Sequence, residues 1–438
     1  MTKDKFMMAE RGSNLSTEIL GGVTTFLTMA YIVAVNPLIL SDAGIPFSAA
    51  LTATCFGAAI MTLIMGLVAN RPVALASGMG ISTLITYSLC LNQGVDWRVA
   101  MACVFLEGLI ILILVICGLR EAIMNAIPVD LRRAIGIGIG LFIAFIGLKG
   151  GGIVCPSEST LVTMGSITDP VVIVALISIA SAAIFTVLNV RGGLLLSIVI
   201  AVLAGIPLGV TQLPTEWNFG FDFSTFAAPF QETPDGGLAI AQVFVKPMLI
   251  MFVFSLLMSD FFDTMGTVIA VGRAGNFCDE KGEVKNLKSI LLIDSLAAAV
   301  GGFFGASSIT SFAESVTGAR SGARTGVSNI VIAILFLICS ALAPVFGIIS
   351  SAATCGALVL VGFACIGDIS SINWNDASCA FPAFVTILMI PLTYSITNGI
   401  GLGFLAFVLI KTFQGKAREV HPLMWVTAAA FLVAFLIA

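Results

Sequence analysis

Two aspartates, Asp260 and Asp263, interrupt an otherwise apolar run of residues from Phe244 to Val271. An apolar run of this length is typical of a membrane-spanning helix. Ionisable side chains at that depth are costly, and they usually line the path of a substrate or an ion. A spacing of three residues places both carboxylates on roughly one face of a helix. The pair is therefore a candidate for accepting hydrogen bonds from a polar substrate, or for carrying protons, inside a membrane.

Two further acids, Glu107 and Asp294, fall inside apolar runs, and we interpret them as structural partners rather than ligands. Basic residues that could pair with any of these acids are absent from the interior of the apolar runs. The acids must then be stabilised by protons, by cations or by hydrogen-bond donors, and this suits proton coupling. The role of Asp260, structural or protonic, is left open.

The composition identifies the class of protein. Of the 438 residues, 58% are hydrophobic and only 10% are charged, whereas a soluble protein carries roughly 25% charged residues. The chain is therefore a polytopic protein of the lipid bilayer, and its net charge of −4 gives no footprint for nucleic acid. The cysteines form no C-x-x-C pair, and the single histidine, His421, lies near the C-terminus. We expect no metal site and no cofactor.

Apolar runs separated by polar breaks predict fourteen membrane spans. With the N-terminus in the cytoplasm, alternating sides place all but three of the 20 basic residues on the cytoplasmic side, as the positive-inside rule requires. Both termini are then cytoplasmic, and the membrane is the cell (inner) membrane. The apolar tail 421–438 is interpreted as an interfacial helix, with a further span as the alternative. The predicted spans are 19–40, 48–69, 77–91, 98–118, 131–148, 169–190, 192–210, 244–272, 287–305, 310–325, 326–347, 350–367, 377–396 and 398–413.

An internal repeat relates the two halves of the chain. An offset of 207 residues aligns Asp169 with Asp376 and Arg191 with Asn398, and a new apolar run starts at the second pair in both halves. Seven spans per half is an odd number, so the halves must have opposite orientations in the membrane. We therefore predict the inverted repeat of secondary transporters, although a chance alignment of apolar runs is the alternative.

Two of the predicted spans, 77–91 and 310–325, are too short to cross about 30 Å of hydrocarbon. Each begins with small and hydroxyl residues that suit a short extended strand before a helix. In inverted repeats, short spans at matching positions indicate the binding site. Free N–H groups at a helix start favour acceptors or anions, so we expect the substrate there.

Glu314 lies at the second of these short spans and has two interpretations. The sequence Ser311-Phe-Ala-Glu314 matches a capping box, in which Glu314 would reach back to a helix start near Ser311. Alternatively, its carboxylate contacts a substrate. The glycines that follow it every four residues, Gly318, Gly322 and Gly326, predict close helix packing rather than binding.

These segments resemble those of the nucleobase–cation symporters, and specifically the AzgA-like purine permeases. The resemblance covers essentially the whole chain and implies an all-α polytopic protein with fourteen spans in two inverted seven-helix repeats, with short strands at the starts of spans 3 and 10. It implies a core domain, here residues 1–118 and 244–349, and a gate domain, here residues 119–243 and 350–438. The matching pieces are Gly22-Val-Thr-Thr-Phe-Leu-Thr-Met-Ala-Tyr-Ile-Val-Ala-Val-Asn-Pro37, Asp260-Phe-Phe-Asp-Thr-Met-Gly-Thr267, Ser307-Ser-Ile-Thr-Ser-Phe-Ala-Glu-Ser315 and Gly322-Ala-Arg-Thr-Gly326.

The resemblance also implies a function, the import of a purine nucleobase driven by protons, with the base held between core and gate. The family's acid of span 8 corresponds to Asp263 and its acid of span 10 to Glu314. The backbone N–H of Ala313 would donate to the base. Protons would bind at Asp260, Asp263 or Glu314. The other candidate substrate-binding residues are Thr310, Ser311, Gly80, Ser82, Thr83 and Thr28.

The start of the third span departs from the family pattern. The family usually has Pro-Gly-Met-Gly-Leu-Asn-Ala followed by aromatic residues, whereas this chain has Ser77-Gly-Met-Gly-Ile-Ser-Thr83 followed by Leu84. That segment faces the site in the family, so a choice between adenine, guanine and hypoxanthine does not carry over. Sodium coupling, an anion carrier of the same fold, and a homodimer remain open. An enzyme is disfavoured, because the chain lacks a nucleophile elbow and a P-loop.

Overall fold

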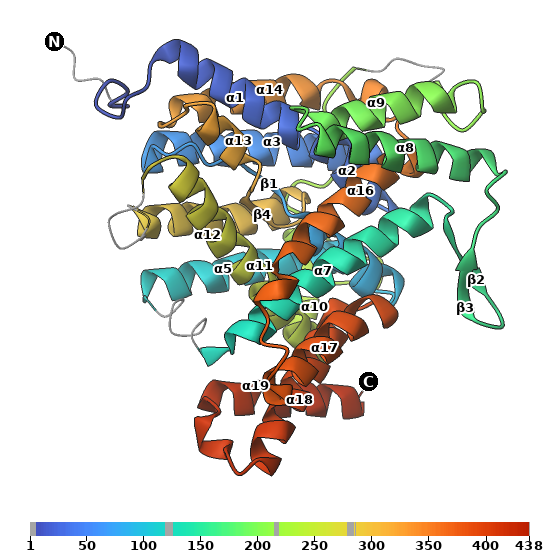
Figure 1. Cartoon of the computed structure of the whole chain (residues 1–438), viewed down its shortest axis with the longest axis vertical. Coiled ribbons are helices and arrows are strands. Elements are labelled where there is room, and N and C mark those ends of the chain that lie inside the picture. The colour runs from blue at the N-terminus through green and yellow to red at the C-terminus, as the bar shows by residue number, and fades with distance from the viewer. Residues whose placement is uncertain (1–5, 119–125, 214–218, 278–283, 285, 438) are drawn as a thin grey trace.

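The structure is a computed structural model that describes residues 6–118, 126–213, 219–277, 284 and 286–437, except the side chains of residues 261–263, 265, 266, 368, 434 and 437. The described part is mostly helical, and most helices run side by side across the molecule (Figure 1). The main helices are α1 (Leu15–Met29), α2 (Ile32–Asp42), α3 (Phe47–Ile64), α4 (Met79–Thr83), α5 (Trp97–Ile116), α7 (Val129–Gly150), α8 (Pro170–Val187), α9 (Gly193–Gly205), α10 (Ala239–Val245), α11 (Pro247–Ala274), α12 (Leu287–Phe304), α13 (Ser315–Arg320), α14 (Val327–Ser340), α15 (Ala343–Phe346), α16 (Ser351–Cys365), α17 (Ala377–Leu392), α18 (Ile396–Phe413) and α19 (Pro422–Ile437). The π-helical segments are η1 (Met65–Ala69) and η2 (Leu84–Leu91), the 3-10 segments are η3 (Ala228–Phe230), η4 (Ile366–Ser371) and η5 (Ala417–Glu419), and the strands are β1 (Leu75–Ser77), β2 (Val154–Ser157), β3 (Leu161–Met164) and β4 (Ile309–Ser311).

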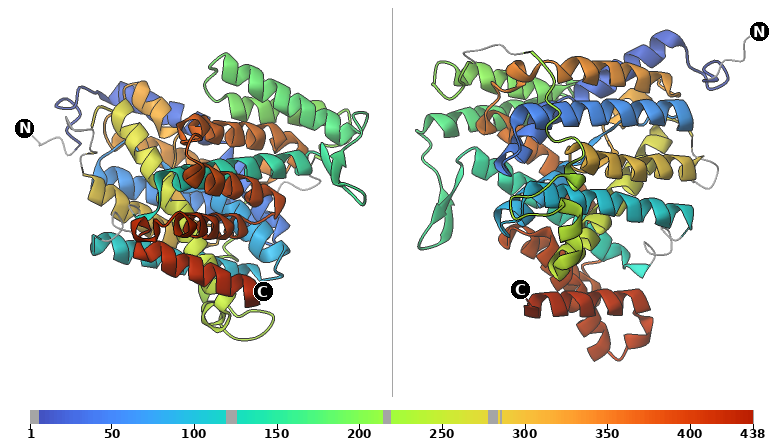
Figure 2. Two further views of the ribbon diagram at one scale, coloured as in Figure 1. Left: turned by 60° about the horizontal axis from the view of Figure 1, so that its bottom comes forward. Right: turned by 180° about the vertical axis from the view of Figure 1, so that it is seen from behind.

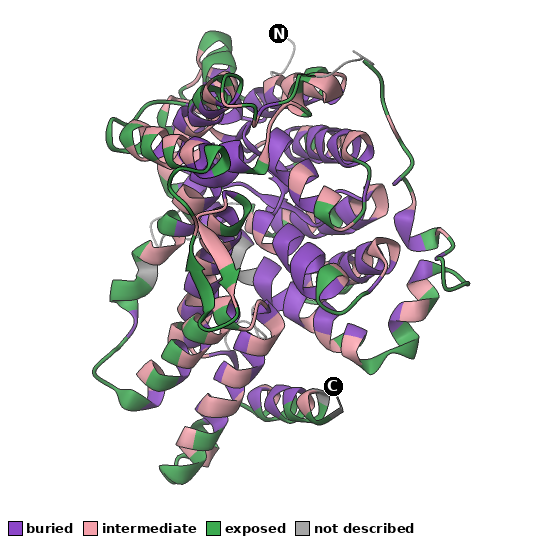
Figure 3. Cartoon of the chain, turned by 90° about the vertical axis from the view of Figure 1, so that its right-hand side faces the viewer, coloured by how far each residue is buried: buried purple, intermediate pink, exposed green. Residues whose placement is uncertain are grey.

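Eight helical stretches of the described residues are long and apolar enough to cross a membrane, and the pair α10–α11, bent by 104°, makes a ninth. Shorter apolar helices include Met79–Leu91, Gly193–Gly205 and Val327–Ser340. Buried residues fill the centre of the molecule, while exposed residues follow its outer helices (Figure 3). Large apolar side chains such as Val187 lie on that outer surface, 79% exposed, which suits contact with lipid. The prediction of a multi-pass membrane protein is confirmed, and the count of fourteen spans stays a prediction.

The helices pack in two groups that each combine both halves of the sequence. In the first group, α5 packs on α12, α3 on α14, and α1 on α13 and α14. In the second group, α16 packs on α7, α8 and α9, and α17 packs on α7 and α18. Figure 2 shows the first group as stacked rows of helices. Helix α11 packs on α5 of the first group, helix α4 packs on α2, and both also contact α7 of the second group, so the groups meet there.

The two aspartates that the predicted repeat aligned each begin a helix. The carboxylate of Asp169 accepts a hydrogen bond from the N–H of Val171 at 2.8 Å and caps α8. The carboxylate of Asp376 accepts one from the N–H of Ser378 at 2.9 Å and caps α17. An aspartate at this position satisfies an N–H group that the helix itself leaves free. The two residues that the offset aligned therefore have the same local role.

The strands β1 and β4 pair antiparallel, with Ala76 opposite Thr310, so segments from the two halves lie together in the interior. The helix start that the capping box predicted near Ser311 is wrong. Ser311 ends β4, and α13 begins at Ser315 with Glu314 as its N-cap residue. The reason is a competing acceptor, because the N–H and hydroxyl of Ser311 both donate to Asp294.

The glycines predicted to allow close packing do so at two positions. A Cβ atom on Gly318 would overlap the Thr25 hydroxyl, and one on Gly326 would overlap the carbonyl oxygen of Gly66. At Gly322, φ is +105°, a conformation that side chains disfavour. A hairpin that the sequence did not predict, β2–β3, projects from one side of the molecule (Figure 1). It falls within a polar break between apolar runs, for which no helix or strand was predicted.

Candidate functional site

The candidate site is built where β1 and β4 turn into short helices. The N–H of Gly78 donates to the carbonyl oxygen of Ser308 at 2.8 Å, so the paired backbones stay in contact up to the start of α4. Gly80 lies within α4, and a Cβ atom added to it would come 3.0 Å from Ile139 of α7. The start of α4 therefore sits at the boundary between the two helix groups.

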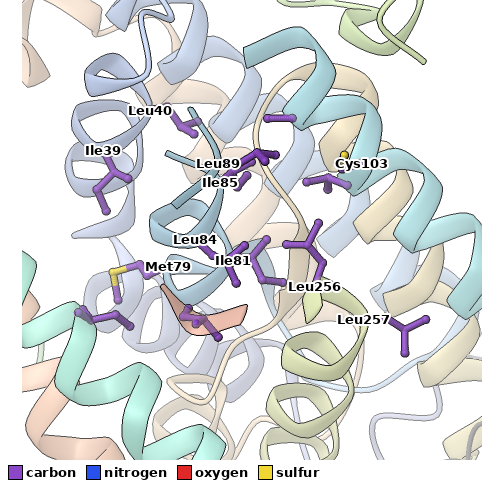
Figure 4. Close-up of a cluster of buried hydrophobic side chains, with 14 of the residues drawn as sticks. Ile39, Leu40, Met79, Ile81, Leu84, Ile85, Leu89, Cys103, Leu256 and Leu257 are labelled. Atoms are coloured by element: carbon purple, nitrogen blue, oxygen red, sulfur yellow. The ribbon is translucent and has the colours of Figure 1, made fainter. Parts of the chain in front are cut away.

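The half-helix formed by α4 and η2 is held by apolar packing rather than by its own length. Figure 4 shows Ile81, Leu84 and Ile85 among side chains from α2, α5 and α11. Leu84 and Ile85 are buried. A short helix is marginal by itself, and tertiary burial of its apolar face stabilises it. This packing fixes where the start of α4 points.

Glu314 is the acid most clearly placed at the site. It is partly exposed, and the hydroxyl of Tyr31 donates to its Oε1 atom at 2.6 Å. Tyr31 lies at the break between α1 and α2. Beside it, the backbone N–H of Ala313, an exposed residue, contacts no acceptor among the described residues. An acceptor and a donor are thus adjacent and accessible at one turn.

Asp294 of α12 holds β4 in position. Its Oδ1 atom accepts hydrogen bonds from the N–H and hydroxyl of Ser311 at 2.9 and 2.8 Å, and its Oδ2 atom accepts one from Thr264 at 2.6 Å. Thr264 and Thr310 share a further hydrogen bond of 3.0 Å. Hydrogen bonds to the charged form stabilise a buried carboxylate. Asp294 is therefore a structural acceptor that joins α11, α12 and β4.

Asn36 of α2 performs a matching role beside α4. Its side-chain oxygen accepts from Ser82, and its side-chain nitrogen donates to Thr54 at 2.8 Å and to the carbonyl of Ala306 at 3.2 Å. The hydroxyl of Thr83 donates to the carbonyl of Gly80 at 2.8 Å. These buried bonds connect the starts of both short helices to the first helix group.

The predicted site residues divide into accessible and internally bonded ones. Ala313 is exposed, and Glu314, Gly80 and Thr28 are partly exposed. The hydroxyl of Thr28 bonds to that of Thr317 at 3.0 Å. The hydroxyls of Ser82, Thr83, Thr310 and Ser311 are buried and have partners inside the protein.

The two acids of the opening motif are both in α11. Asp260 is fully buried. The side chain of Asp263 lies outside the described residues, although its backbone belongs to α11. Its chain neighbour Thr264 bonds to Thr310 of β4, so this turn of α11 runs beside the second strand.

Tyr31 and Asn36 were not among the site residues predicted from the sequence. Both lie within the Gly22 to Pro37 segment that carries part of the resemblance, and Tyr31 is one of only three tyrosines in the chain. That rarity was a usable signal. The chemistry available is hydrogen-bond exchange by a carboxylate, a phenol and a free amide. The described residues contain no group of three or more His, Cys, Asp or Glu side chains that could hold a metal ion.

The chain is similar to known permeases over nearly its whole length. A model of the Permease family (Xan_ur_permease) matches residues 16–402. Guanine/hypoxanthine permease PbuO of Bacillus subtilis (strain 168) is 37% identical over 438 residues, which cover 98% of this chain and 99% of the relative. Adenine permease AdeP of Escherichia coli (strain K12) is 36% identical over 99% of this chain and 95% of the relative.

A solved structure shows the same fold. The transmembrane domain of a cyanobacterium bicarbonate transporter, BicA, aligns with a TM-score of 0.66 at 16% identity, over 88% of this chain and 97% of that one. The family match spans most of the sequence, and the relatives are similar over nearly their whole length. The chain therefore belongs to the permease family and is a multi-pass membrane transporter rather than an enzyme.

Proposed function

We propose that this protein is a secondary active transporter that imports a purine nucleobase by proton symport. The relatives named as guanine/hypoxanthine and adenine permeases support the substrate class. The observation that carries the proposal is the partly exposed Glu314, whose carboxylate is held by Tyr31, next to the free N–H of Ala313. The edge of a purine offers donors and acceptors side by side, and an adjacent acceptor and donor complement it.

The proposed grip uses two carboxylates and one backbone N–H group. Glu314 accepts an N–H of the base, and Ala313 donates to a ring nitrogen or a carbonyl oxygen. We assign Asp263 as the second carboxylate, because the next residue in α11, Thr264, is bonded to β4. The start of α4 at Gly80 lies on the other side of the strand pair. Asp260, Asp263 and Glu314 are the proposed proton carriers.

The proposed motion moves one helix group against the other. We assign the first group to a core domain, residues 1–118 and 244–349, and the second to a gate domain, residues 119–243 and 350–438. We retain fourteen spans in two inverted repeats, an inner-membrane location and cytoplasmic termini. The base would sit where α4 faces α7. When the two helix groups separate at this boundary, a path to the base opens.

Uptake of labelled purine tests the proposal directly. In vesicles containing the purified protein, an inward proton gradient is expected to drive accumulation of adenine, guanine or hypoxanthine, because binding of protons to the site acids couples the two fluxes. A sodium gradient without a proton gradient should have no effect. Accumulation driven by a sodium gradient would mean that sodium, rather than the proton, is the coupling ion. Failure of every purine, with uptake inhibited instead by bicarbonate or sulfate, would favour an anion carrier and end the proposal.

We propose that two tyrosines keep one side of the boundary between the helix groups closed. The ring of Tyr87, in η2, packs edge-on against Tyr394, in the turn between α17 and α18, with centroids 5.8 Å apart. The hydroxyl of Ser88 donates to the carbonyl of Tyr394 at 3.0 Å, and the hydroxyl of Tyr87 donates to Asp42 at 2.7 Å. Contacts between the two groups on this side must break before it can open.

Replacing Tyr394 by alanine is expected to shift the protein toward a state open on this side. An aromatic pair contributes about 1 kcal/mol, so the open population should rise about fivefold. Thr354 lines the adjoining pocket and is buried, so a cysteine placed there reports access through its rate of labelling by a polar thiol reagent. Tyr394→Phe keeps the ring and should label slowly. Equal rates in the alanine and phenylalanine variants would argue against this closure.

A further inference from the structure

A pocket with three arginines lies at the side of the molecule where the N-terminal segment packs. Its volume is about 360 Å³, and its lining includes Arg11, Arg71 and Arg324 together with Glu10 and Phe277. Arg11 belongs to the N-terminal segment, Arg71 to the connection between η1 and β1, and Arg324 to the turn before α14. None of these residues is among those proposed to hold the base or carry protons.

The arginines of this pocket are incompletely neutralised. Within the part of the chain that the structure describes, none of the three forms an ion pair with a carboxylate. Glu10 lines the pocket, and Glu18 acts electrostatically on Arg11. Glu18, however, already accepts hydrogen bonds from two backbone N–H groups of the turn before α14. Among the residues that the structure describes, three cations face two anions, so this part of the pocket is positive.

Arg71 is the most constrained of the three. Its side chain is only 7% exposed, and its Nε atom has no hydrogen-bond partner among the described residues. The guanidinium lies over the ring of Phe277, 4.6 Å from the centroid. Burial, and after it the nearby charge of Arg11, lowers the pKa of Arg71 to about 10. A buried cation without a counter-ion is costly, so a bound anion would stabilise it.

The other two arginines, Arg11 and Arg324, bond to backbone carbonyls and still have free N–H donors. The Nη1 atom of Arg11 donates to the carbonyl of Asn70, and the Nη1 atom of Arg324 donates to the carbonyl of Ala323 at 2.8 Å. A guanidinium carries five N–H donors, and the remaining nitrogens of both side chains contact no acceptor in the described ranges. The groups are therefore preorganised beside Arg71 rather than consumed by the fold.

We propose that this pocket binds a phosphate group. The planar fork of arginine matches the oxygens of phosphate, and such charge-assisted pairs are strong. Water takes up about 30 Å³ per molecule in the liquid, so the pocket has room for a phosphate and several waters. The orientation predicted from the distribution of basic residues places the pocket at the cytoplasmic side of the membrane. Two sources share this chemistry there, the head group of an anionic lipid and a soluble phosphorylated molecule.

The test uses the full-length protein purified in a neutral detergent. In one arm, thermal unfolding is measured in inorganic phosphate and in chloride at equal ionic strength. In the other, the protein is taken from vesicles of phosphatidylcholine and phosphatidylglycerol, and its retained lipid is measured by native mass spectrometry. Stabilisation by phosphate identifies a soluble ligand, and selective retention of phosphatidylglycerol identifies a lipid. Whichever of the two ligands binds, phosphate or phosphatidylglycerol, Arg71→Gln should weaken its binding by about tenfold or more.

Two further variants make the outcome decisive. Arg11→Gln removes a partly exposed member of the trio and covers the case in which Arg71→Gln does not fold. Arg191→Gln removes an exposed arginine from the turn between α8 and α9, and it should bind like the unmodified protein. Binding of neither probe, binding that survives both pocket variants, or an equal loss in Arg191→Gln would overturn the proposal. Purine uptake, measured separately, does not enter this result.

Discussion

Glu314→Gln is expected to abolish purine uptake while leaving the protein folded in the membrane. Glutamine keeps the size of the side chain and an oxygen that can accept from Tyr31, 2.6 Å away in the structure. It removes the negative charge and the site for a proton. A hydrogen bond to a charged group contributes about 1.5–3 kcal/mol, so binding alone should weaken roughly 10- to 100-fold. The measurement is the initial rate of uptake, normalised to the protein found in the membrane.

Three companion variants separate binding from other effects. Tyr31→Phe removes one donor and keeps the acid, so it should reduce uptake less than Glu314→Gln does. Asp263→Asn should abolish uptake if the second carboxylate grips the base. Glu158→Gln alters an exposed acid in the β2–β3 turn and should leave uptake unchanged. Normal uptake in both Glu314→Gln and Asp263→Asn would sink the proposed site.

Gly326→Ala is expected to destabilise the folded protein strongly. The residue has φ −71°, which alanine adopts easily, so the effect isolates packing from backbone strain. The added Cβ atom would overlap backbone atoms of Gly66, and backbone cannot move aside as a flexible side chain can. Overpacking costs typically 1–3 kcal/mol and occasionally more. We expect a lower midpoint of thermal unfolding and less monodisperse protein after extraction.

The control is a glycine inside a helix, whereas Gly326 is the N-cap residue of α14. Gly136 of α7 has no atom within 4 Å of an added Cβ atom. Gly136→Ala should therefore leave stability unchanged or raise it, since alanine favours a helix over glycine by about 1 kcal/mol. If both substitutions gave the same midpoint, contact between the backbones at Gly66 and Gly326 would not be what stabilises this crossing.

Local patterns carried much of the fold. The apolar runs predicted a multi-pass membrane protein, and the aspartates at the repeat positions, Asp169 and Asp376, do begin helices. Spaced glycines predicted close packing at Gly318 and Gly326, and the structure has it. These features depend on neighbours in the chain or on composition, so one sequence contains them.

The site depended on contacts between distant residues. The sequence Ser311-Phe-Ala-Glu314 fits a capping box, yet Asp294 takes both donors of Ser311 and holds it in a strand. Tyr31 reaches Glu314 across 283 positions of sequence, which no local spacing predicts. The cluster of three arginines likewise joins segments that the sequence keeps apart.

The sequence by itself determined the class of protein, the positions of many apolar helices and the two short spans that mark the proposed site, because hydropathy and backbone chemistry act locally. Only the tertiary structure decided which polar groups are free. Ser82, Thr83, Thr310 and Ser311 have the right types to bind a base, but their hydroxyls bond within the protein. Glu314 and the N–H of Ala313 remain accessible. The reason is that a buried polar group must find a partner, and folding alone determines which partner lies within reach.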